Sequence, residues 1–240
     1  MAGSRAEILG KIRLGLAKPR TEHHDGHRSQ ISHIRELFAS AYPPDSLIEK
    51  FRTEFERVSG KLAVCKNSDL AVDTIKDLIL SSCFKQVAVS KHAVCRQLCL
   101  LEKLRTELPE VQFWGEDINS ENPFERLSLR GTLAQVQLSI TGAEYLVADI
   151  GSILVTAGAQ ASRQISLLPS THLVIATPDQ IYPNMAELFS KIYEQHGENL
   201  PGSALTLITG PSRTADIEKV LIKGVHGPTR LLAILLADHD

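Results

Sequence analysis

The segment LITGPSRTADIEKVLIKGVHGP, residues 207–228, carries the densest group of side chains suited to chemistry in this chain. A turn that begins at Gly210 supplies two hydroxyl groups and one guanidinium group, from Ser212, Thr214 and Arg213. We expect an apolar strand over 204–209, then this turn, and then a helix over 216–222. These residues are therefore candidates to bind a ligand.

The expected helix favours an anion at its start. Free backbone N–H groups and the positive end of the helix dipole lie at such a junction, and ligands of open parallel sheets bind at the carboxyl edge of the sheet. Asp216, in the first turn, would stabilise the helix but repel an anion. Anion binding and simple helix capping both remain open.

A second turn, GVHGP at 224–228, places His226 between two glycines, of which Gly227 is a further candidate for ligand contact. Histidine is the side chain most often used as an acid or base near neutral pH, so His226 is a candidate catalytic residue. The alternative is a helix stop in which His226 is only hydrogen-bonded. We expect the 210–214 and 224–228 turns to face one shared pocket at the carboxyl edge of the sheet.

A third group lies in ITGAEYLVADIGSILV, residues 140–155, where Asp149, Gly151 and Ser152 follow one another closely. Buried carboxylates are costly unless they are paired. Asp149 therefore either caps local backbone amides or meets a cation or a ligand hydroxyl, which makes it the second candidate catalytic residue. Arg163 can bind a carboxylate through two hydrogen bonds or lie on the surface. We expect Asp149 and Arg163 to approach the shared pocket from neighbouring strands.

The elements that must position these residues follow from the apolar pattern. Short β-branched runs predict strands, and apolar residues at steps of three and four predict helices between them. The expected strands are 61–65, 86–90, 111–113, 137–140, 152–156, 172–176, 204–209 and 230–236, and the expected helices are 69–81, 92–108 and 184–195. This order predicts an α/β fold, a three-layer open and mostly parallel sheet with helices on both faces.

The first residues of the chain do not follow this apolar pattern. Residues 1–18 are expected to form a short N-terminal helical segment, residues 19–34 a polar linker, and residues 35–240 the α/β domain. The linker holds His23, His24 and His27, which either form a metal site or lie in a solvated tether. We favour the tether, because nothing apolar would fix the ligands.

Composition excludes several classes of function. The 240 residues are 43% hydrophobic and 22% charged with a net charge of −2, so nucleic acid is not an expected partner. No apolar run is long enough to cross a membrane and no signal peptide is recognisable, so we expect a cytoplasmic protein. Common nucleotide, NAD, serine-hydrolase and zinc-protease motifs are absent. The four cysteines form no CxxC pair, and Cys95 and Cys99 are expected one helical turn apart, so no metal is predicted in this chain.

These blocks together resemble the LUD domain, and most closely the lactate-utilisation protein C (LutC/YkgG-like) family. The resemblance covers 137–238 strongly and 35–115 in its element order; at position 150, where the family usually has Ser or Thr, this chain has Ile150. The matching residues are Ile140-Thr141, Ala148-Asp149, Gly151-Ser152, Arg163, 166–169, 210–212, 215–218 and 224–228.

The resemblance implies a NagB/RpiA/CoA-transferase-like fold and a place in a three-protein system that oxidises L-lactate to pyruvate. It implies no cofactor in this chain and iron–sulfur clusters in the partner subunits. We expect a subunit that binds a small anionic ligand or docks the iron–sulfur oxidoreductase subunits. The alternatives are a stand-alone isomerase or acyl/CoA-transferase-type enzyme for a small phosphorylated or carboxylate substrate, and a purely structural subunit.

Overall fold

The computed structural model describes residues 10–11, 13, 43–115, 131–158, 162–197, 201–215, 221–223 and 227–237. The chain divides into two compact units, residues 1–37 and 38–240. In the first unit, residues 10, 11 and 13 are helical. The rest of the predicted N-terminal helix and the whole histidine-bearing linker lie outside the described residues, and the predicted domain boundaries stay a prediction.

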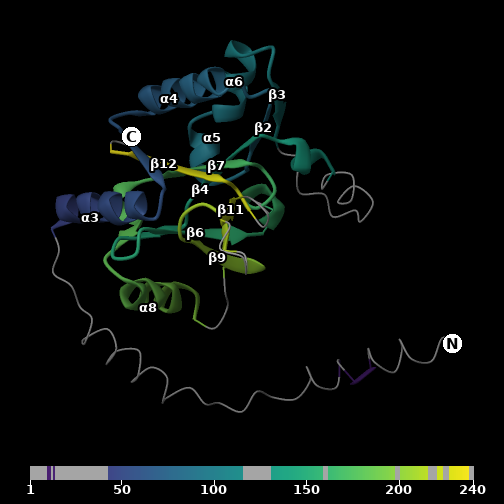
Figure 1. Ribbon diagram of the computed structural model, residues 1–240. Helices are drawn as coiled ribbons and strands as arrows, with labels where there is room; N and C mark the ends of the chain where they lie inside the picture. The colour runs from purple at the N-terminus through teal and green to yellow at the C-terminus, as the bar shows by residue number, and fades with distance from the viewer. Residues whose placement is uncertain are drawn as a thin grey trace. The chain divides into compact units, whose positions relative to one another are not determined.

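The second unit is built on a six-stranded sheet in the order β1-β12-β7-β4-β2-β3, in which every neighbouring pair is parallel (Figure 1). Its strands are β1 (Lys61–Cys65), β2 (Gln86–Val89), β3 (Gln112–Trp114), β4 (Leu138–Gly142), β7 (Thr171–Ala176) and β12 (Arg230–Leu236). The predicted α/β class with a mostly parallel central sheet is confirmed.

One face of this sheet is covered by α4 (Ser68–Ser81), α5 (Ala93–Gln97) and α6 (Leu100–Glu107) (Figure 1). The apolar stripes of these helices pack on strand residues such as Val89, Ile140 and Leu173 in one buried cluster. Burial of such stripes is the main driving force for docking amphipathic helices.

The helix predicted over 92–108 is wrong, because α5 and α6 are two helices. They are separated at Cys99, which has a left-handed backbone with φ of 47°. The apolar spacing continues through the break, so the sequence pattern did not reveal it. Cys95 is buried and Cys99 is exposed, so the two thiols do not share a helix face as expected.

The other face of the central sheet packs against α3 (Pro44–Arg57) and a second sheet in the order β8-β5-β6-β9. Its strands are β5 (Tyr145–Val147), β6 (Ser152–Ala157), β8 (Ile181–Tyr182) and β9 (Ala204–Ile208). The predicted strands at 152–156 and 204–209 therefore belong to this sheet, where β6 and β9 pair antiparallel. Apolar strand runs look alike in either sheet, so sequence periodicity did not separate them.

The far side of the second sheet is covered by α8 (Met185–His196), whose Leu188 and Ile192 pack on Val147 and Leu154 (Figure 1). The Asn184 side chain caps this helix by accepting a hydrogen bond from the Glu187 backbone N–H at 3.0 Å. Among the described residues, no helix has the length and apolarity needed to span a bilayer.

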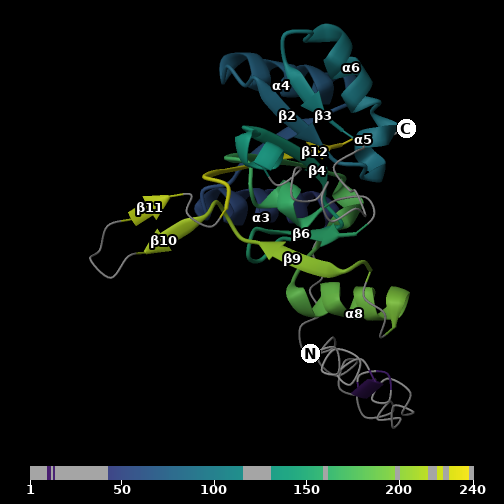
Figure 2. The ribbon, with the colours of Figure 1, turned by 90° about the vertical axis from the view of Figure 1, so that its right-hand side faces the viewer.

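The helix predicted over 216–222 is wrong at its last two residues, because Leu221 and Ile222 lie in a strand. Antiparallel strands β10 (Arg213–Ala215) and β11 (Leu221–Lys223) pair with each other and extend away from β9 in Figure 2. The apolar residues near 217–222 fit a helix face, but the segment is also rich in β-branched side chains, which suit strands. Residues 216–220, including Asp216, lie outside the described residues.

Candidate functional site

The topology marks one edge of the central sheet as the place for a ligand. From β2 the chain passes to β3 on one side, and β4 then returns to the other side of β2. Ligands of open α/β sheets bind at the carboxyl ends of strands where the strand order reverses in this way. In this protein that position lies at the ends of β2 and β4.

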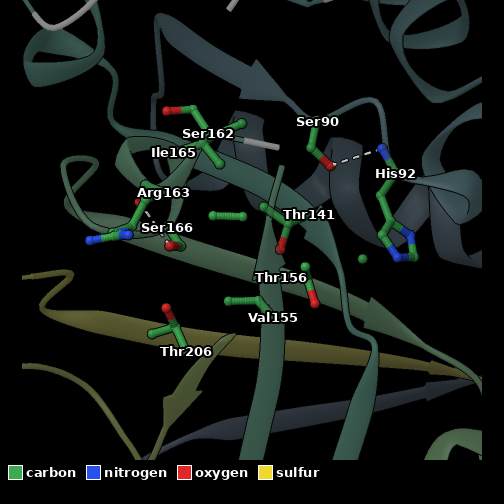
Figure 3. Close-up of a pocket in the computed structure, with 12 residues that line it drawn as sticks. Ser90, His92, Thr141, Val155, Thr156, Ser162, Arg163, Ile165, Ser166 and Thr206 are labelled. Carbon is green, nitrogen blue, oxygen red and sulfur yellow. Dashed lines mark hydrogen bonds between the residues drawn. The ribbon is translucent and has the colours of Figure 1, made fainter. Parts of the chain in front are cut away.

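A small cavity, which we call the inner pocket, lies there between the two sheets (Figure 3). Its volume is about 20 Å³, enough for one water-sized group. No Asp or Glu occurs among its described lining residues. Its polar walls include Ser90, His92, Thr141, Arg163, Ser166 and Thr206.

His92 is held firmly at this pocket by its neighbours. Its Nδ1 accepts the backbone N–H of Val94 at 3.4 Å, so the side chain caps α5. A Cβ on Gly142 would collide with the imidazole ring, so this strand position must be glycine for the ring to lie there. The other ring nitrogen, Nε2, lies 3.6 Å from Glu144 Oε1.

Glu144 holds a negative charge beside His92. The interaction with the His92 ring lowers the pKa of the Glu144 carboxyl, against the opposing effect of burial. An ionised Glu144 favours a protonated Nε2 on His92, which fixes the orientation of the ring. No local sequence motif indicates this pair, since the two residues lie on different segments.

Arg163 begins the short 3₁₀ turn η2 (Arg163–Ser166), and the Ser166 hydroxyl donates to its backbone carbonyl at 3.1 Å. The Arg163 side chain is exposed and has no ion pair with the described carboxylates. Figure 3 draws its guanidinium group on the opposite side of the pocket from His92. The positive charge therefore lies at the mouth of the pocket, where it can meet an acidic group of a ligand.

A wider pocket of about 590 Å³, the outer pocket, shares Ser166 and Thr206 with the inner pocket. It lies between the end of α3, the residues after β9 and the turn before β12, and its walls include Val58, Ile208, Gly210, Ser212, Gly227 and Leu231. The structure thus brings Gly210, Ser212 and Gly227 together, and the Ser212 N–H donates to the Pro228 carbonyl at 2.8 Å. Their role in ligand binding stays a prediction.

The position of the outer pocket differs from the expected one. It is lined by His172 and Leu231, at the amino ends of β7 and β12, and so does not lie at the carboxyl edge of the central sheet. The expectation was wrong because β9 belongs to the second sheet and not to the parallel one. Gly210 has φ of 77°, and a Cβ there would collide with the Val58 carbonyl, so the turn depends on glycine.

His172 was not singled out from the sequence. Its ring is fully buried, and its Nε2 lies 2.9 Å from the Thr141 hydroxyl. Burial lowers the pKa of His172 to about 4, so the imidazole is neutral near pH 7. Thr141 lines the inner pocket and His172 the outer one, so this pair lies between the two.

The remaining predicted site residues lie elsewhere. Asp149 lines neither pocket: it is in the turn between β5 and β6, where its N–H donates to the Pro183 carbonyl at 3.1 Å and burial raises its pKa. The expected approach of Asp149 to Arg163 and Ser212 at one pocket is therefore not seen. Gly151 packs against the backbone of Phe55.

Ser152 does not line the outer pocket. Its hydroxyl lies 2.6 Å from the hydroxyl of Thr209, which does line it. Arg213 and Thr214 are backbone positions of β10, and their side chains lie outside the described residues, as does His226. The catalytic role proposed for His226 and Asp149 stays a prediction.

In the described part of the chain, no group of three or more His, Cys, Asp or Glu side chains is arranged to hold a metal ion. Cys65 and Cys95 are buried, while Cys83 and Cys99 are exposed. Burial raises the pKa of the Cys95 thiol to about 12, so it stays protonated near neutral pH.

Comparison with known proteins identifies the family. The chain is 31% identical to uncharacterized protein YkgG of Escherichia coli, over 64% of each chain, and 26% identical to lactate utilization protein C of Bacillus subtilis, over 97% of this chain and 93% of that one. The match to the E. coli protein thus spans less than two thirds of its length. A crystal structure of a DUF162 family protein from Deinococcus radiodurans has the same fold, with a TM-score of 0.56, 18% identity, and coverage of 81% of this chain and 99% of that one. The sequence profile of the LUD domain matches residues 48–236, and the chain belongs to the LUD domain family.

Proposed function

We propose that this chain is a subunit of a lactate-utilisation system and that it binds a small carboxylate, L-lactate or pyruvate, at the inner pocket. Family membership and the relatives named lactate utilization protein C support the first part. The chemistry of the inner pocket supports the second part. We infer that the system works in the cytoplasm.

The observation that carries the proposal is the charge of the pocket walls. Hydroxyl groups, a histidine and the guanidinium group of Arg163 line the inner pocket, without a carboxylate among the described lining residues. Such a set of donors and one fixed positive charge suits a small anion. Because the cavity holds one water-sized group, a ligand oxygen enters it while the carboxylate stays at the mouth with Arg163.

Oxidation of lactate to pyruvate releases electrons, so the proposed system needs a group that accepts them. We infer that iron–sulfur oxidoreductase subunits supply this redox chemistry and that the present chain holds or delivers the carboxylate. The stand-alone isomerase or acyl-transferase alternative requires an acid and a base of its own. Asp149, one of its two candidates, lines neither pocket.

Calorimetric titration of the purified chain with L-lactate and pyruvate tests the binding step. Removal of a charge-assisted hydrogen bond costs about 1.5–3 kcal/mol, so Arg163→Ala should weaken binding about tenfold or more. Arg96→Ala is a matched control, because Arg96 is exposed on α5 and lines neither pocket.

Equal affinity of Arg163→Ala and Arg96→Ala would overturn the assignment of the inner pocket. The partner is tested separately, by adding the isolated chain to lactate with and without the iron–sulfur subunits of the same organism. We expect lactate oxidation only in the mixture. Chemical conversion of a carboxylate or phosphorylated substrate by the isolated chain would favour the stand-alone enzyme instead.

A further inference from the structure

We propose that the outer pocket is a second binding site, separate from the small-carboxylate site, and that it takes an amphipathic organic anion much larger than lactate. The size of the pocket is the first reason. At about 590 Å³ it falls in the range of roughly 300–1,000 Å³ typical of sites for drug-sized ligands and cofactors. A three-carbon acid would leave most of this space to water.

The pocket is held open by contacts between separate segments. The Ser212 N–H binds the Pro228 carbonyl at 2.8 Å, which ties the residues after β9 to the turn before β12. Gly210 packs closely on the Val58 carbonyl at the end of α3. A pocket whose walls are fixed before binding loses less conformational entropy when a ligand enters.

Several lining residues of the pocket are apolar. Val58 follows the end of α3, Ile208 and Leu231 come from β9 and β12, and Pro211 and Pro228 add rigid apolar surface. Leu167, in the turn after η2, also lines the pocket and keeps 37% of its surface exposed. Such walls suit an aromatic or aliphatic body, which gains free energy when it leaves water.

Other lining residues offer polar groups. The hydroxyls of Thr206 and Ser212 line the pocket without hydrogen-bond partners among the described residues. Arg57 adds a positive charge; its Nε binds Glu54 Oε2 at 2.6 Å, and its remaining N–H groups are available to an acidic group. A ligand with an apolar body and an anionic end matches both kinds of lining residue.

His172, which lines the outer pocket, is an independent reason to expect a polar ligand atom there. It is fully buried, and its Nδ1 has no hydrogen-bond partner in the described part of the chain. Buried polar atoms are usually satisfied, so an unused nitrogen beside a pocket points to a polar atom that arrives with a ligand or its bound water. Because the two pockets share Ser166 and Thr206, this ligand would lie next to the small carboxylate.

The probe that tests this inference is 8-anilinonaphthalene-1-sulfonate, which has an aromatic body and an anionic group. Its neutral counterpart, N-phenyl-1-naphthylamine, has the same body without the sulfonate. In a fluorescence titration of the folded chain, we expect one site for the sulfonate and about tenfold weaker binding of the neutral compound. Excess L-lactate should not displace the sulfonate.

Two variants identify the place of binding. Gly227→Leu fills the outer pocket, where a new Cβ would lie 3.3 Å from Ser212 Cβ, and should weaken probe binding at least tenfold. Gly131→Leu adds the same side chain where nothing lies within 4 Å, and serves as the control. Arg57→Ala, on an exposed side chain, should weaken binding of the sulfonate but not of the neutral compound.

Thermal melts establish that each variant is folded, because partly folded chains also bind this probe. If Gly227→Leu fails to fold, Arg57→Ala still tests whether the sulfonate binds in the outer pocket. Equal affinity for the charged and neutral probes, or sulfonate binding unchanged in Arg57→Ala, would overturn the inference. Displacement by L-lactate would do the same, because it would place both ligands in one site.

Discussion

The two faces of the central sheet differ although the same strands supply both. On the helix-covered face, β4 and β7 bury Leu138, Ile140 and Leu173 in an apolar cluster. On the face toward the second sheet, the alternate residues of these strands include Thr141 and His172, both buried. Side chains of a strand alternate between faces, so one register fixes both surfaces.

Both faces bury apolar residues, Val174 and Leu235 among them on the second face, so the two faces differ in the added polar side chains. Apolar burial on the helix face contributes free energy through removal of surface from water. Polar groups on the other face contribute little net free energy even when paired, and they cost free energy when left unpaired. We infer that the second face keeps polar side chains because the two pockets lie beside them.

The largest effect is expected from the helix face. Ile140→Ala removes a fully buried side chain and should lower the free energy of unfolding by about 2–5 kcal/mol, as measured by urea denaturation. The control is Leu80→Ala on α4, whose side chain is 58% exposed and should matter little. The affinities of folded Ile140→Ala for lactate and for the probe should be unchanged. A tenfold loss of either affinity would show that the helix-covered face also affects binding.

The second-largest effect is expected in the pH dependence of stability, to which His172 contributes. Its pKa is about 4 in the folded chain and about 6.5 when unfolded, so the unfolded chain binds more protons between these values. The stability contributed by the neutral ring is complete above pH 6.5 and is lost as the pH falls toward 4, by roughly 3 kcal/mol. His172→Gln cannot be protonated and should lose less stability than the parent between pH 7 and 4.5. Parallel urea midpoints across that range would contradict the buried, neutral histidine.

A smaller effect is expected for the hydroxyl that pairs with this ring. Thr141→Val keeps the shape but leaves His172 Nε2 without its partner, which should cost about 1–3 kcal/mol in the free energy of unfolding at pH 7. Ser139→Ala, on the same face, breaks only a long 3.4 Å hydrogen bond and should cost less. The reverse order in thermal melts would show that the Thr141–His172 pair is not the main polar contact on this face.

Much of the central sheet could be predicted from the sequence. The strands at 61–65 and 230–236 have the predicted bounds, because long apolar runs between polar turns leave few alternatives. The hairpin at 213–223 was missed because its apolar spacing fits both a helix and a strand. The second sheet was missed because strand pairing is set by contacts distant in sequence, which local patterns do not record.

The candidate site was only partly accessible to sequence reasoning. Arg163, Gly210 and Ser212 were selected from short motifs, and all three line the pockets. His172 and His92 were not selected, because each is isolated in sequence. Glu144 lies in the 140–155 segment, but only the fold brings it to His92. A usable signal did exist for His172, since Ser139 and Thr141 mark a polar face on the neighbouring buried strand.

The smallest effect is expected at the edge of the polar face, where Glu144 meets His92. Glu144→Gln keeps the size of the side chain but removes the negative charge, and partly exposed ion pairs contribute only about 0–1 kcal/mol. The pKa of Glu144 is lowered in the folded chain, so its contribution to stability is present above the unfolded pKa and is lost as the pH falls through the folded pKa. The difference in unfolding free energy between parent and Glu144→Gln should therefore be largest near pH 7 and vanish in acid. Urea denaturation of the parent and of Glu144→Gln at pH 7 and in acid gives the test. The same difference at both pH values would mean that the two side chains do not interact in solution, and that His92 is held only by its cap on α5.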